Sequence, residues 1–183
     1  MEHVRVQRVA ACGFAAIALF GLPAIAAAAP PKELLGKSVV VTWSEQRVQR
    51  FVGEANFRNV NASHTLSIYV SGAGRVFSKF QASTRLGTGA NEQVAGQGGN
   101  RIPSFSGNRM TMIQPGQGMA RMISVEFDSG FGSCNASAVR GKEAGVASGY
   151  GTSVINGKRL EIQSVNTSGA SCSVKSGNVF EGQ

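Results

Sequence analysis

The sequence predicts an all-β protein, in which an antiparallel meander of about 8–10 short strands forms a small barrel or sandwich after an N-terminal signal peptide. The clearest strand is 64–71, HTLSIYVS, where Leu66, Ile68 and Val70 alternate with polar residues. This period of two is typical of a strand with one buried face. Turn signals recur at fairly even spacing along the chain, and no sustained helical period accompanies them.

Residues 1–28 have the features of a secretory signal peptide. Arg5 and Arg8 precede an apolar run over 9–25, and small residues at its end resemble a cleavage site. The run is too short for a confident membrane helix, which needs about 20 apolar residues. We therefore expect residues 29–183 to be a single exported β-domain without a membrane span, located in the periplasm or outside the cell.

The mature chain is strongly basic. The full sequence holds 18 Lys and Arg against 10 Asp and Glu, and removal of the signal peptide leaves 16 against 9, a net charge of +7. Such a charge favours attraction to an anionic envelope component or an acidic protein. The basic residues form no dense tract, so nucleic acid is not an expected partner.

Two cysteines, Cys134 and Cys172, remain after export, because Cys12 leaves with the signal peptide. In an oxidising compartment an even pair predicts one disulfide, and closing this loop would stabilise the fold by about 4 kcal/mol. Two buried thiols are the alternative. A redox-active pair is disfavoured because the C-x-x-C spacing is absent.

The first half of the domain predicts a strand at 37–43 and a hairpin formed by 64–71 and 75–83. Glycines between the two hairpin strands supply the turn. The polar segment 45–51 is interpreted as an extended edge. The stretch 86–101 is rich in Gly, Asn and Gln and is interpreted as a long loop.

In the second half, Asn156 and Gly157 predict a two-residue type I′ turn that joins two strands. We expect Ile123, Val125 and Phe127 to face the core, because they alternate with Ser124 and Glu126. Strands are predicted at 104–114, 119–128, 133–140, 152–155, 158–165 and 170–175.

The chain is poor in groups that catalyse reactions or bind metals. His64 is the only histidine after the signal peptide, and we expect its imidazole to be exposed at a strand edge or singly bonded. One histidine does not build a typical zinc site, so no metal, cofactor or catalytic residue is predicted. A Ser-His-Asp triad would need His64 and Asp128, but no G-x-S-x-G motif supports it. Charge balance for the arginines accounts for the carboxylates of Glu45, Glu54, Glu126, Asp128, Glu143 and Glu161.

One surface site is predicted on the strand 75–83. Arg75, Phe77 and Lys79 lie two residues apart and share a face, while Val76 and its alternating neighbours share the other. If the second face is buried, an aromatic ring is left outside between two cations, which is suited to an anionic or ring-bearing partner.

Three hypotheses for function follow. The first is a non-enzymatic exported binding module that presents a basic surface to an anionic envelope component or protein. The second is a β-barrel that carries a small apolar ligand in a cavity. The third is a hydrolase with an unrecognised site. The cavity of the second hypothesis would be lined by Met110, Met112, Ile123, Val125 and Phe127.

Overall fold

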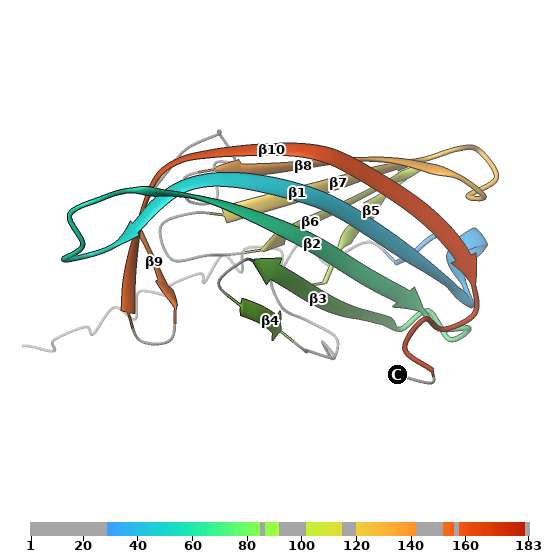
Figure 1. The fold of residues 1–183 in the computed structure, drawn as a ribbon. Helices are drawn as coiled ribbons and strands as arrows, with labels where there is room; N and C mark the ends of the chain where they lie inside the picture. Colours follow the sequence, from blue (N-terminus) through green and yellow to red (C-terminus); the bar gives the residue numbers. More distant parts are fainter. Residues whose placement is uncertain are drawn as a thin grey trace, which may run out of the picture.

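The computed structural model is almost entirely β-structure, as predicted. It describes residues 29–84, 87–91, 102–114, 120–141, 152–155 and 158–181. This part of the chain forms ten strands in two antiparallel sheets, with one short 3-10 helix, η1 (Lys32–Leu34) (Figure 1). The predicted signal peptide lies outside the described residues. Within them, no helix has the length and apolar character needed to cross a membrane.

The larger sheet has six strands in the order β4-β3-β2-β1-β10-β9. The first described strand, β1, lies in the middle of this sheet and pairs on one side with β2 and on the other with the last strand, β10. The strands are β1 (Lys37–Phe51), β2 (Arg58–Val70), β3 (Val76–Thr84), β4 (Gly87–Asn91), β9 (Thr152–Ile155) and β10 (Lys158–Ser176).

The smaller sheet has four strands in the order β5-β6-β7-β8. Each strand pairs with its neighbour in sequence, so this sheet is a simple meander. Hydrogen bonding among the described strands therefore gives two separate sheets, and it does not close them into one barrel. The strands are β5 (Ser104–Ser106), β6 (Arg109–Gln114), β7 (Ala120–Phe127) and β8 (Cys134–Gly141).

The two sheets share one apolar core. The alternating residues of β1, β2, β6 and β7 that face this core are each at most 2% exposed. They form a single cluster, which places the inner faces of both sheets against each other. The two sheets contribute Val39, Val41, Leu66, Ile68, Met110, Met112, Ile123 and Val125.

Two β-bulges shape the long strand β10. Its register with β1 shifts between Thr42 and Ser44 and again between Val48 and Gln49, with one extra residue in β10 each time. Gly169 lies at the first shift with a φ of +63°, a conformation that glycine adopts readily. Bulges bend a strand, and β1 and β10 arch together over the smaller sheet (Figure 1). The alternating inner residues of β10 are Leu160, Ile162, Val165, Thr167, Ala170, Cys172 and Val174.

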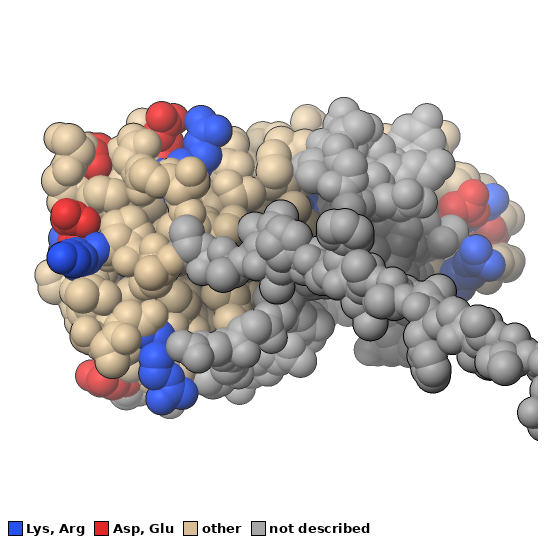
Figure 2. All heavy atoms as spheres, turned by 180° about the vertical axis from the view of Figure 1, so that it is seen from behind, with Lys and Arg blue, Asp and Glu red and all other residues tan. Residues whose placement is uncertain are grey.

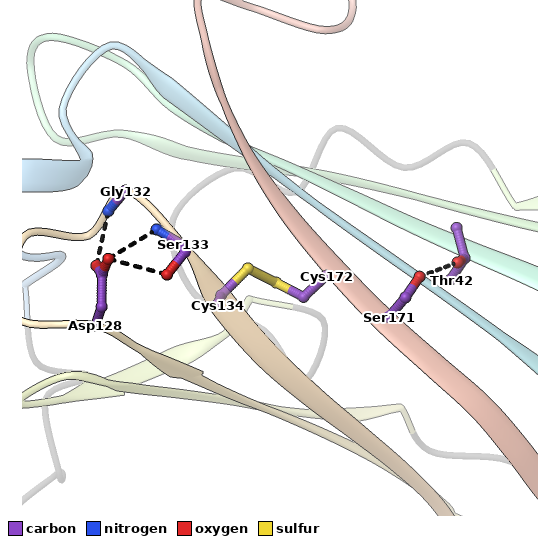
Figure 3. The surroundings of a disulfide bond; sticks show 7 residues. All are labelled: Thr42, Asp128, Gly132, Ser133, Cys134, Ser171 and Cys172. Carbon is purple, nitrogen blue, oxygen red and sulfur yellow. Dashed lines mark hydrogen bonds between the residues drawn. A yellow bond between two sulfur atoms is a disulfide. The ribbon is translucent and has the colours of Figure 1, made fainter.

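The predicted disulfide joins the two sheets. Cys134 is the first residue of β8 and Cys172 lies in β10, with their Cα atoms 5.6 Å apart (Figure 3). The turn before β8 is fixed by Asp128, whose carboxylate accepts hydrogen bonds from the backbone of Gly132 at 2.8 Å and the hydroxyl of Ser133 at 2.9 Å. The disulfide therefore begins next to an ordered turn. It connects two sheets whose described strands are not hydrogen-bonded to each other in a β-ladder.

The structure corrects four of the predicted elements. The segment 45–51 is not an edge, because it continues β1 in the centre of the larger sheet. The predicted loop 86–101 contains β4, and the predicted strand 104–114 is divided by a turn at Gly107, whose φ is +57°. The two last predicted strands form the single strand β10, since its bulges allow it to continue past Gly169.

Candidate functional site

The inner face of β1 changes from apolar to polar halfway along the strand. Trp43 ends the apolar series, and Glu45, Arg47 and Gln49 follow it with the same period of two and are also buried. Further along the strand, Phe51 packs against a second, smaller apolar cluster. A polar band therefore lies between two apolar parts of the interior.

Glu45 is the centre of this band, and three arginines bind its carboxylate. Arg47 Nε lies 3.0 Å from Oε2, Arg121 Nε lies 2.9 Å from Oε1, and Arg140 Nη1 lies 2.8 Å from Oε2. Arg121 comes from β7 and Arg140 from β8, so the smaller sheet supplies two of the cations. The Glu45 side chain is fully buried. We call Glu45, Arg47, His64, Arg121 and Arg140 the buried ion cluster.

His64 completes the cluster from β2. Its Nε2 atom lies 3.3 Å from Glu45 Oε2 and 3.2 Å from Arg47 Nη2. The imidazole stacks between the rings of Trp43 and Phe80, with centroid distances of 5.1 Å and 5.5 Å. The expectation of an exposed or singly bonded histidine at a strand edge is therefore wrong, because His64 lies inside β2 and is buried.

The charges of the cluster shift the pKa values of its members. Burial alone would raise the pKa of Glu45, but its hydrogen bond with His64 and the charges of Arg121 and Arg140 hold that pKa well below its ordinary value. Burial lowers the pKa of His64 despite the nearby carboxylate. Burial also lowers the pKa of Arg121 to about 10, with Arg140 adding repulsion. At neutral pH the cluster therefore holds one anion, three cations and a neutral imidazole.

We expect the free energy of unfolding to fall as the pH is lowered from about 7 to about 5.5, and to fall less in a His64→Gln variant. The pKa of His64 is lowered in the folded protein, so its imidazole stays neutral over this pH range. In the unfolded chain the imidazole has its ordinary pKa of about 6.5 and therefore binds a proton over the same range. Proton uptake thus favours unfolding by up to about 1.4 kcal/mol per pH unit. Urea denaturation at several pH values tests this, and equal slopes in both proteins would contradict it.

The predicted surface residues meet on the outer face of β2 and β3. The guanidinium carbon of Arg75 lies 5.6 Å from the centroid of the Phe77 ring, and Phe77 stacks on Tyr69 of β2 at 6.1 Å. Lys79 follows on the same face, opposite Ser67. Val76 of the alternating set packs against the core, as the prediction required. We call Tyr69, Arg75, Phe77 and Lys79 the outer aromatic patch.

A second group of cations and aromatic rings lies near the turn that joins β1 to β2. The two arginines of this group are paired with carboxylates of the protein. The guanidinium carbon of Arg50 lies 4.4 Å from the centroid of the Phe57 ring, while Arg50 also binds Glu161. Arg58 similarly pairs with Glu54. In the described part of the face shown in Figure 2, Lys and Arg are scattered, several beside an acidic side chain, and they form no continuous basic area.

The structure does not bring the residues of the hypothetical triad together. The Asp128 carboxylate is exposed and holds its own turn, where hydrogen bonds from the Gly132 backbone and the Ser133 hydroxyl lower its pKa. Within the described structure, His64 Nε2 contacts Glu45 and Arg47, and Nδ1 has no partner. No serine hydroxyl is therefore bonded to the imidazole in the part of the chain that the structure describes.

Sequence patterns did not identify the buried ion cluster. One local signal exists, since Glu45 and Arg47 continue the odd-numbered alternation that begins at Val39. Arg121 and Arg140 give no such signal, because only the packing of the two sheets brings them to β1. Comparison with protein-family models, curated proteins and solved structures finds no match. The function is therefore inferred from the chemistry of these sites.

Proposed function

We propose that this chain is an exported, non-enzymatic binding module that recognises an acidic polysaccharide of the cell envelope through the outer aromatic patch. The observation that carries this proposal is the stack of Arg75 on Phe77 and of Phe77 on Tyr69 on the outer face of the larger sheet. Flat apolar rings suit the faces of sugar rings, and the adjacent cations suit carboxylate or sulfate groups. The net positive charge of the mature chain adds long-range attraction.

Within the patch, Arg75 is better suited to an external anion than the cations near the β1–β2 turn. Arg50 and Arg58 each bind a carboxylate of the protein itself. Among the described residues, Arg75 contacts a ring and forms no ion pair. A cation that lacks an acidic neighbour loses less when it binds an anionic partner.

The other two hypotheses receive less support. The five residues expected to line a ligand cavity are buried in the core, where they pack against β1 and β2. Glu45 does contact His64, but three guanidinium groups bind this carboxylate and hold its pKa low. A carboxylate in that state is a poor proton donor or acceptor.

Affinity measurements with polygalacturonate, and with neutral dextran as the uncharged control, test the proposal. We expect the oxidised mature protein to bind only the acidic polymer, and binding to weaken as salt is added. The variant Arg75→Gln/Lys79→Gln should bind about five- to tenfold more weakly, as should Phe77→Ala. The matched control Arg159→Gln/Lys175→Gln removes the same charge from exposed positions of β10 and should bind like wild type.

Two results would overturn the proposal. Equal losses in the patch variant and in the control variant would show that net charge alone attracts the polymer. Binding to phosphatidylglycerol vesicles or to an acidic protein, without binding to polygalacturonate, would assign a different class of partner.

A further inference from the structure

The outer side of β1 and β2 carries neutral polar side chains in rows that cross the strands. The centre of this area consists of three cross-strand pairs, which are Thr42 with Thr65, Ser44 with Ser63, and Gln46 with Asn61. We call these six residues the outer polar face. The two threonines are half-buried, and the other four residues are exposed. The rows continue on both sides into exposed residues of β10 and β3, namely Ser168, Ser171, Gln81 and Ser83.

This part of β1 places its charged residues inside the protein and its neutral polar residues outside. Glu45 and Arg47 are buried, whereas Ser44 and Gln46, which alternate with them, are exposed. Charged side chains ordinarily lie in water, because burying a charge costs more free energy than burying a hydroxyl or an amide. The segment therefore contains charged residues, yet the outer polar face carries none. Such a face is suited to a partner that is bound through neutral hydrogen bonds.

The outer polar face is continuous with the outer aromatic patch. Tyr69 of the patch and Thr65, Ser63 and Asn61 lie on one side of β2, which is the side turned away from the smaller sheet (Figure 1). A strand rises about 3.3 Å per residue, so the line from Tyr69 to Asn61 is about 26 Å long. One sugar ring stacked on Phe77 is much shorter than this line. A ligand held at the patch therefore reaches the outer polar face only if it is a chain.

We propose that the outer polar face binds successive sugar units of an acidic polysaccharide chain that the outer aromatic patch holds at one end of the face. This inference rests on the proposed function and adds the path of the chain along β1 and β2. Sugar hydroxyls donate and accept hydrogen bonds, as do the hydroxyls and amides of the face. Thr42 Oγ1 and Ser171 Oγ are hydrogen-bonded at 2.8 Å (Figure 3), and each oxygen keeps the capacity to bond a sugar hydroxyl.

Other classes of partner match the outer polar face less well. Nucleic acids and anionic membrane surfaces are bound largely through Lys and Arg. Sheets that pack face to face do so through interdigitating side chains that form an apolar core. The six residues of the face offer neither feature. A hydrogen bond that replaces one with water contributes little by itself, so the face should strengthen the binding of long chains without holding single sugars.

Calorimetric titration of the oxidised mature protein with two oligogalacturonates of different length tests the inference. Digalacturonate reaches only the outer aromatic patch, whereas a long oligogalacturonate also covers the outer polar face. We expect the wild-type protein to bind the long chain more tightly, because contacts made along one tethered chain reinforce one another. The variant Asn61→Ala/Ser63→Ala should bind the long chain about five- to tenfold more weakly and should bind digalacturonate like wild type.

The chain contains a matched control for this variant. The tripeptide Asn-Ala-Ser at 61–63 recurs at 135–137 in β8 of the smaller sheet, where its Asn and Ser are again exposed. The variant Asn135→Ala/Ser137→Ala should therefore bind both oligomers like wild type. Substitutions at exposed positions change stability little, so these variants should remain folded. A second face variant, Ser44→Ala/Gln46→Ala, repeats the test on β1.

The possible failures of this experiment are distinguishable. If both face variants bound the long chain like wild type, binding would be confined to the patch, which would overturn the inference and leave the proposed function intact. An equal loss in the control variant would also overturn the inference. Self-association in light scattering that only the face variants abolish would assign the face to a second copy of the chain. Failure of the wild-type protein to bind either oligomer would overturn the proposed function as well.

Discussion

Replacement of Glu45 by glutamine is expected to lower the free energy of unfolding by about 3–5 kcal/mol. The variant keeps the shape of the side chain but leaves Arg47, Arg121 and Arg140 together without the carboxylate that all three bind. Three buried cations then repel one another. Because a domain of this size is stable by only about 5–15 kcal/mol, the variant should unfold at much lower urea concentration, followed by circular dichroism.

The control for this experiment is Glu161→Gln in β10. Glu161 binds a single arginine, Arg50, and both side chains are more than 30% exposed. Exposed pairs of this kind contribute about 1 kcal/mol or less. If the Glu45 and Glu161 variants lost the same stability, the burial of the cluster would have no energetic consequence.

Removal of the disulfide by the double substitution Cys134→Ser/Cys172→Ser is expected to lower the free energy of unfolding by about 4 kcal/mol. The bond closes a loop with a sequence separation of 38 residues and so restricts the unfolded chain. It also joins β8 to β10, which have no hydrogen-bonded ladder between them. Urea denaturation of the two proteins, each with and without reductant, measures the effect.

Reductant separates the role of the bond from that of the substituted side chains. It should destabilise the wild-type protein and leave the double serine variant unchanged. Mass spectrometry of the unreduced wild-type protein should find neither cysteine alkylated. A wild-type protein whose unfolding midpoint did not respond to reductant would contradict the prediction.

Much of the fold follows from local patterns in the sequence. The alternation in 64–71 and the glycine-containing turn after it predicted the β2–β3 hairpin, and Asn156 with Gly157 predicted the pairing of β9 with β10. Errors arose where polar residues occupy interior positions. Glu45 and Arg47 suggested an exposed edge, because a polar side chain inside the protein is unexpected until its partners are known.

The two sites differ in how far the sequence could predict them. The outer aromatic patch depends on one strand, so the spacing of Arg75, Phe77 and Lys79 was sufficient to place them on one face. The buried ion cluster depends on residues up to 95 positions apart, as for Glu45 and Arg140. Composition and spacing do not predict such contacts, because they form only when the second sheet packs on the first.

The central position of β1 affects how the protein can fold during synthesis. This strand of 15 residues emerges first, but its partner on one side, β10, is the last described strand to be made. Until then one side of β1 presents unpaired backbone groups, which favour association with other chains. Folding should consequently be slow and should finish only after synthesis of the chain is nearly complete. A chaperone that shields extended segments would then increase the yield of the native protein.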